Sequence, residues 1–218
     1  MGRKLLVVPV FHSEAEMGTV RDYMRAVGES VFGKERWERH RADVERFWVE
    51  AERSLQERLA RVDMKSVKLY QDGQVIDGPI GMKIVEQIAD AGSKNHQILL
   101  ELIKRGATLM RTESFELLKE EHGLVKAIAT AGDAKERAMA AEAYARRKDS
   151  LLEERDVAIA RNMARTLGEG ELGILFIGAF HKVEGKLPPD IEVEQLGGET
   201  AKRLKEDLAA IERLAQQK

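Results

Sequence analysis

Two short apolar runs, one near each end of the chain, each finish in a histidine. Residues 4–12 read KLLVVPVFH, and residues 173–181 read GILFIGAFH. Their β-branched and aromatic residues predict strands that are buried on both faces of a sheet. His12 and His181 are therefore expected at the carboxyl ends of core strands, the edge where open α/β sheets bind their ligands. If the two strands are parallel neighbours, both imidazoles face one pocket.

Helical periodicity fills much of the sequence between these runs. A capping box of Ser13 and Glu16 predicts a helix that begins directly after His12 and ends near Gly28. Apolar residues then recur at spacings of three, four and seven in the longest helical stretches, residues 34–62 and 133–167. Further helices are predicted over residues 80–91, 94–105 and 113–122, and from about residue 199 to the carboxyl terminus.

Three more strands are predicted, over residues 66–71, 107–110 and 191–196. Strands separated by helices favour an α/β fold with a mostly parallel central sheet of four to five strands and long helices packed on it. Thr112 and Glu113 are expected to cap the helix that follows the third strand, and His122 and Gly123 to end it. The long helices either cover the strand ends or form the interface of a homo-oligomer.

Composition narrows the class of protein. With 218 residues, of which 43% are hydrophobic, the chain is expected to form one domain spanning residues 1–218. A net charge of −2 with interspersed signs argues against nucleic acid and membrane partners. No apolar run approaches the ~20 residues that cross a bilayer, and the first run is too short for a signal peptide, so we expect a cytoplasmic protein. Cysteine is absent, which leaves histidine and carboxylates as metal ligands.

Polar residues also lie on the apolar face of the helix that precedes His181. A helical wheel places Asp156 near the centre of the stripe formed by Leu152, Ile159 and Met163, with Arg155 at its edge. Because an unpaired buried charge is costly, both side chains must find partners in the core or in a polar cleft.

These residue types are suited to two kinds of chemistry. Two histidines with one or two carboxylates form a site for a divalent ion, Mn, Co, Zn or Fe, with an open position for water. Arg155 or Arg111 would then hold an oxyanion or a substrate carboxylate. Alternatively, one histidine acts as a general base aimed by a carboxylate, without a metal. The sequence leaves both open.

The carboxyl-terminal part of the chain resembles a known family. The segments LLEERD at 151–156, ARNMA at 160–164 and GAFH at 178–181 are similar to the signature of the TraB/PrgY pheromone-shutdown family. That family shares a superfamily with the TIKI metalloproteases, the haem-binding ChaN proteins and the erythromycin esterases. Its members carry G-x-x-H at the first strand, where this chain has Pro9-Val-Phe-His12 and so replaces glycine by proline.

The resemblance implies a hydrolase that cleaves a peptide, ester or amide bond of a small-molecule or peptide substrate at the strand ends. It assigns catalytic roles to His12, His181, Arg155 and Asp156, and adds Asp72 as the acidic residue after the second strand. The implied ligands of a divalent metal are His12, His181 and Asp72. The alternative, suggested by the ChaN relatives, is a non-catalytic module that binds haem or a peptide signal in the same crevice.

Overall fold

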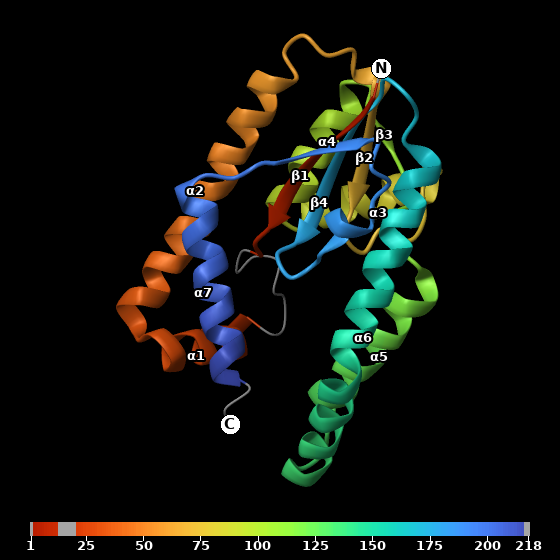
Figure 1. Ribbon diagram of the computed structural model, residues 1–218. Helices are drawn as coiled ribbons and strands as arrows, with labels where there is room; N and C mark the ends of the chain where they lie inside the picture. The colour runs from red at the N-terminus through yellow and green to blue at the C-terminus, as the bar shows by residue number, and fades with distance from the viewer. Residues whose placement is uncertain (1, 13–20, 216–218) are drawn as a thin grey trace.

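The fold is built on a sheet of five parallel strands (Figure 1). A computed structural model describes residues 2–12 and 21–215, so the predicted capping box of Ser13 and Glu16 lies outside the described residues. The sheet order is β3-β2-β4-β1-β5, and the α/β fold predicted from the alternating patterns is confirmed. The strands are β1 (Arg3–Val10), β2 (Val67–Gln71), β3 (Thr108–Leu109), β4 (Leu172–Gly178) and β5 (Ile191–Gln195).

Helices connect the strands and account for most of the described chain. Most of the predicted bounds are confirmed to within two residues, but the helix expected over residues 34–62 ends four residues earlier. The helix expected to end near Gly28 continues to Phe32, because Gly33, with a φ of 75°, and not Gly28, has the left-handed conformation that ends it. The helices are α1 (Arg21–Phe32), α2 (Lys34–Arg58), α3 (Gly78–Asp90), α4 (Lys94–Lys104), α5 (Phe115–Ala129), α6 (Ala134–Thr166) and α7 (Glu199–Ala215), with short 3-10 turns η2 (Met64–Ser66) and η3 (Val183–Lys186).

The start and end predicted for α5 were wrong. Ser114, not Thr112 or Glu113, is the N-cap residue, and its side chain accepts a hydrogen bond from the Leu117 amide. The helix also continues through Gly123 to Ala129. Gly123 is not among the described glycines with positive φ, so it has no helix-ending left-handed conformation. The half-buried Leu124 continues the helix beyond it.

The two faces of the sheet are covered by different helices. One face packs against α2, α3, α4 and α7, through a large cluster that includes Val8, Trp48 and Phe176. The other face packs against the second half of α6, through Tyr70, Ile159 and other buried side chains. The carboxyl ends of the strands therefore lie between two helical layers, and α6 is the helix that brings polar side chains to them.

Pro9 lies in β1, which has neighbours on both sides. Residues that alternate along a parallel strand use the same side of it, so the backbone of Pro9 faces the same neighbour as that of Val7. The Val7 carbonyl accepts from the Leu196 amide on the β5 side, and the β1–β5 register ends at the pair Val7 and Gln195. The N–H that proline lacks would therefore point past the end of β5, which is why proline is tolerated here.

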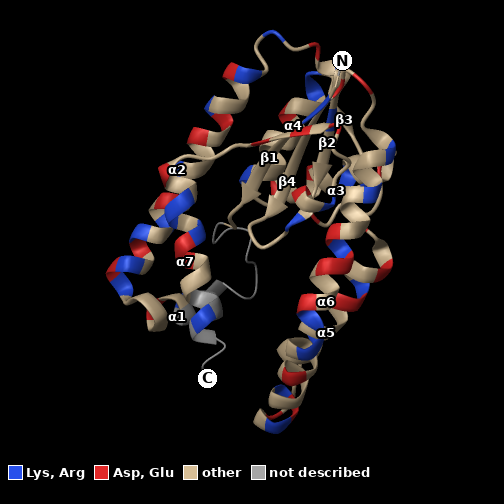
Figure 2. Ribbon diagram, in the orientation of Figure 1, with Lys and Arg blue, Asp and Glu red and all other residues tan. Residues whose placement is uncertain are grey.

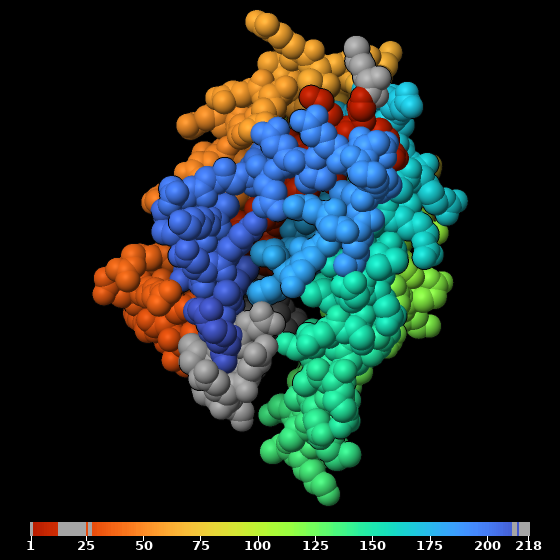
Figure 3. Space-filling view, viewed as in Figure 1, coloured from red at the N-terminus to blue at the C-terminus, as the bar shows by residue number. Residues whose placement is uncertain are grey.

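Helices α5 and α6 extend away from the sheet as an antiparallel pair (Figure 1). None of the α5 residues is buried, and the buried residues of α6 begin only at Leu151. We call α5 and residues 134–150 of α6 the arm, and its green and teal atoms project from the rest of the molecule (Figure 3). In the part of the chain that the structure describes, no helix has the length and apolar character needed to span a bilayer.

Candidate functional site

The candidate site lies at the carboxyl ends of β2 and β4. From β2 the chain continues through α3 and α4 to β3, at one edge of the sheet. From β4 it continues to β5, at the other edge. The connections therefore diverge between these two neighbouring strands, and such a point is where open α/β sheets bind ligands. Asp72 follows β2 directly, and His181 follows β4 after a tight turn in which its amide donates to the Gly178 carbonyl.

Asp72 is fixed by the backbone of β4. Its amide donates to the Phe176 carbonyl at 2.8 Å, which extends the ladder between β2 and β4 by one residue. Its carboxylate oxygen Oδ2 accepts from the Gly178 amide at 3.1 Å. A Cβ on residue 178 would lie only 3.1 Å from that same oxygen, so glycine allows the carboxylate to approach the strand closely.

Glu113 is held on the other side of the site by the loop after β3. The amides of Thr112 and Glu113 both donate to the Gln74 carbonyl, at 2.8 and 3.0 Å. The Thr112 hydroxyl accepts from the Gln71 amide at 3.0 Å, and the Thr112 carbonyl accepts from the side chain of Asn162 on α6 at 2.9 Å. These bonds connect the loop to β2 and α6, and they place the fully buried Glu113 side chain against the sheet edge.

Arg155 reaches this edge from α6 and pairs with three carboxylates. Its Nη2 donates to Asp72 Oδ1 at 2.7 Å and to Glu113, and its Nη1 donates to Glu121 Oε2 of α5 at 2.5 Å. The side chain is only 7% exposed. The helical wheel therefore placed the charge correctly in the interior, and the ion pairs supply the partners that a buried guanidinium requires.

Asp156, the next residue on α6, fixes His181. Its Oδ1 lies 2.5 Å from His181 Nδ1, and its Oδ2 accepts from the Lys182 amide at 2.7 Å. A carboxylate can only accept, so Nδ1 carries the proton and Nε2 is the atom that faces the rest of the site. His181 Nε2 lies 3.5 Å from Asp72 Oδ2.

Burial and charge set the protonation of the three titratable groups that face one another. Burial would raise the pKa of Asp72, but the charges of His181 and Arg155 outweigh it and hold that pKa below its ordinary value. Burial raises the pKa of Glu113 more than Arg155 lowers it. Burial lowers the pKa of His181, but the hydrogen bond to Asp156 and the negative charge of Asp72 together outweigh it, so this pKa is raised. Glu113 thus holds a proton more readily than Asp72.

Asp72, Glu113 and His181 form a group that could hold a metal ion, since one ligand atom from each lies within 4.8 Å of the others. The prediction named Asp72 and His181, and the structure brings both together with Arg155 and Asp156. His12 is in a different position: it follows β1, its side chain is exposed, and it is not among the described residues of this group. Its role as a metal ligand stays a prediction.

Sequence reasoning missed Glu113 and Glu121. Glu113 was predicted to be a helix cap, although it lies in the loop that leaves the third strand, as Asp72 lies in the loop that leaves the second. That shared position at a strand exit was the signal that could have identified it. Glu121 had no comparable signal, because nothing in its local pattern distinguishes it from the solvent-facing glutamates of α5.

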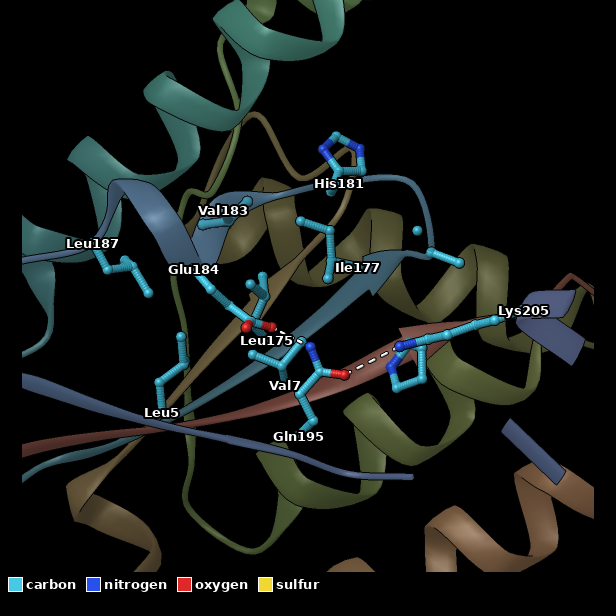
Figure 4. A pocket seen from close by; sticks show the side chains of 13 residues that line it. Leu5, Val7, Leu175, Ile177, His181, Val183, Glu184, Leu187, Gln195 and Lys205 are labelled. Carbon is cyan, nitrogen blue, oxygen red and sulfur yellow. Dashed lines mark hydrogen bonds between the residues drawn. The ribbon is translucent and has the colours of Figure 1, made fainter. Parts of the chain in front are cut away.

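A small cavity lies next to His181 on the α6 face of the sheet (Figure 4). Its volume of about 30 Å³ has room for about two water molecules. Apolar side chains of β1 and β4 form much of its wall, including Val7, Leu175 and Ile177. Gln195 crosses one side of it, donating to Glu184 and accepting from Lys205 Nζ at 3.1 Å (Figure 4).

Comparisons with protein-family models, with curated proteins and with solved structures find no match to this chain. The resemblance to the TraB/PrgY family therefore stays a prediction, carried by the residues of the sequence itself.

Proposed function

We propose that the chain is a hydrolase whose Asp72, Glu113 and His181 hold a divalent metal ion. The observation that carries this proposal is the relation between His181 Nε2 and Asp72 Oδ2, which face each other at 3.5 Å. Because Nδ1 holds the imidazole proton, a neutral His181 presents a lone pair to a carboxylate. Two such acceptors need a cation between or beside them, either a second proton on the ring or a metal ion.

The balance of charge supports a cation in addition to Arg155. The carboxyl groups of Asp72, Glu113 and Glu121 converge here on one guanidinium, and the carboxylate of Asp156 contacts His181. Negative charge in surplus within a partly buried site favours a bound cation, and mixed nitrogen and oxygen ligands suit Zn, Mn, Co or Fe. Asp156 acts on His181 as carboxylates act on metal-bound histidines in many proteins, by fixing the tautomer and the ring orientation.

The residues of the proposed site would have different roles in hydrolysis. A bound divalent ion would acidify a water molecule and polarise the scissile carbonyl. Arg155 engages three carboxylates, so we assign it to positioning Asp72 and Glu113 rather than to the oxyanion. Glu113 would complete the proposed ligand set with Asp72 and His181. The cavity beside His181 has room for water or a small substituent.

The type of bond, a peptide, ester or amide, rests on the resemblance to the TraB/PrgY family. The alternative, a haem-binding module, is less favoured by the surroundings of His181. Its side chain is 5% exposed, both ring nitrogens face carboxylates, and the adjacent cavity is about 30 Å³. A haem titration tests the alternative: a Soret shift that His181→Gln abolishes would support haem binding and contradict our proposal.

Metal content tests the proposal directly. The protein is purified without a metal-binding tag, incubated with Mn²⁺ or Zn²⁺ and desalted. Elemental mass spectrometry then gives the number of metal ions per chain. We expect about one ion per chain, and its loss in Asp72→Asn, Glu113→Gln and His181→Gln. The matched control Glu116→Gln removes an exposed carboxylate of α5 and should retain the ion. A wild-type protein that binds no ion, or ligand variants that bind as well as wild type, would refute the metal site.

His12→Ala belongs in the same series. Retention of the ion in this variant would leave Asp72, Glu113 and His181 as the protein ligands, whereas its loss would add His12. Hydrolysis of ester and peptide substrates is then compared with and without a chelator, and activity that survives complete metal removal would favour His181 as a metal-free general base.

A further inference from the structure

A groove separate from the metal-binding residues runs along the outer side of α6. Its volume is about 520 Å³, and it lies between α6, the loop after β3 and the start of α5. Arginine side chains line it from both sides, Arg111 from the loop and Arg161 and Arg165 from α6. Figure 2 shows basic positions on the part of α6 beside the sheet. Leu117, Val157 and Ala158 add apolar surface.

The positive charge of this groove is only partly balanced by the protein. None of its three arginines forms an ion pair with a residue that the structure describes. The two acidic residues of the groove are already paired with cations elsewhere: Glu153 with Lys186 at 2.8 Å and Glu154 with Arg147 at 2.6 Å. Three guanidinium groups therefore face one groove without an ion pair to a described residue, and among them Arg111 has a longer-range charge interaction with the exposed Glu116.

Local structure adds to this preference for an anion. The groove includes Ser114, the N-cap of the 15-residue helix α5, whose amino terminus carries partial positive charge. Arg111 Nε donates to the Glu113 carbonyl at 3.2 Å, which holds its guanidinium beside that helix start. Guanidinium groups bind phosphate in bidentate geometry, and several of them together select a multiply charged ligand.

We propose that this groove binds a soluble ligand that carries two or more phosphate groups and has an apolar part. The phosphates lie between Arg111, Arg161 and Arg165, and the apolar part contacts Leu117 and Val157, which is 41% exposed. The site shares no residue with the proposed metal ligands, so it is independent of the proposed hydrolase activity.

Calorimetric titration with inorganic pyrophosphate, in metal-free buffer of low ionic strength, tests the proposal. The double variant Arg161→Ala/Arg165→Ala should weaken pyrophosphate binding at least tenfold. The control Arg53→Ala/Arg137→Ala removes the same charge from two exposed arginines outside the groove and should bind as wild type. Affinity should fall steeply with added salt, because the contacts are ionic.

Several outcomes would overturn the proposal. These are no binding of pyrophosphate at millimolar concentration, an equal loss in the control variant, or tighter binding of citrate than of pyrophosphate through the same arginines. Binding to vesicles that contain phosphatidic acid without binding to pyrophosphate would assign the groove to a membrane and overturn the soluble ligand. His181→Gln should leave the pyrophosphate affinity unchanged, so that failure of the metal site and failure of the groove are distinguished.

Discussion

Asp156 illustrates how one buried side chain can specify a site without touching what the site binds. The residue is 1% exposed, and its two oxygens engage His181 Nδ1 and the Lys182 amide. It therefore sets both the ring orientation of His181 and the path of the chain after β4. In the proposed metal site this makes Asp156 a positioning residue rather than a ligand.

Asp156→Asn should lower the affinity for Zn²⁺ or Mn²⁺ by about 10- to 100-fold, because the amide no longer stabilises the required tautomer and basicity of His181. Competition with a fluorescent chelator measures this affinity. The chain supplies a matched control, since Asp207 pairs with His40 Nδ1 at 3.1 Å outside the site. Asp207→Asn should leave the metal affinity unchanged, and an equal loss in both variants would contradict the role of Asp156.

His181 should also make stability depend on pH. Its pKa in the folded chain is raised above 6.5, so its protonated form stabilises the fold fully below that value, and the contribution is lost as pH rises through the folded pKa. Urea unfolding from pH 6 to pH 9, with a chelator present, measures the effect. The stability advantage of wild type over His181→Gln should shrink across this range. His122→Gln, a change at an exposed position of α5, should run parallel to wild type.

At the scale of elements, periodicity was sufficient for most helices and strands but not for the ends of α1, α2 and α5. Apolar runs predicted β1 and β4, and the helical wheel of α6 predicted that Arg155 and Asp156 lie in the interior. Both predictions succeed because burial imposes these patterns directly on the sequence. The start of α5 was missed because Thr112 and Ser114 are both reasonable caps in isolation. Only the tertiary bonds to Gln74, Gln71 and Asn162 decide that Glu113 turns inward.

Two glycines should respond to the same substitution with opposite signs. Gly123 lies within α5 with no atom near the position of an added Cβ, so Gly123→Ala should stabilise the chain by about 0.5–1 kcal/mol. Gly73 follows Asp72 with a φ of 79°, where a side chain is strained, so Gly73→Ala should destabilise. Urea unfolding of both variants is the measurement. A destabilised Gly123→Ala would mean that helix propensity does not limit α5.

At the scale of the whole molecule, the order of the strands could not be predicted from the sequence. The two strands that end near His12 and His181 are parallel neighbours, as was considered from the sequence, but the position of β4 between β2 and β1 depends on long-range packing that local sequence patterns do not show. The divergence of the connections between β2 and β4 was therefore invisible, although residues on both sides of it were selected as candidates. His12 shows the converse: it ends a similar run, yet it lies outside the group of Asp72, Glu113 and His181.

The arm should be the least stable part of the described chain, because none of the residues of α5 is buried and α6 has no buried residue before Leu151. We expect amides of residues 115–150 to exchange with deuterium well before those of β1 and β4, measured by mass spectrometry on a dilute sample. Repeating the measurement at high protein concentration tests the predicted homo-oligomer. Selective protection of the arm would place a second copy there, and protection equal to that of the sheet in the dilute sample would contradict the prediction.

The position of β1 in the sheet affects how the chain can fold as it is synthesised. Both neighbours of β1, which are β4 and β5, lie about 160 residues or more further along the chain. At ribosomal rates of about 5–20 residues per second, the apolar β1 segment waits roughly ten to thirty seconds for a partner. During that interval it is exposed to chaperones and to other nascent chains. Pro9, which withholds one backbone donor, makes this waiting strand a poorer template for intermolecular pairing.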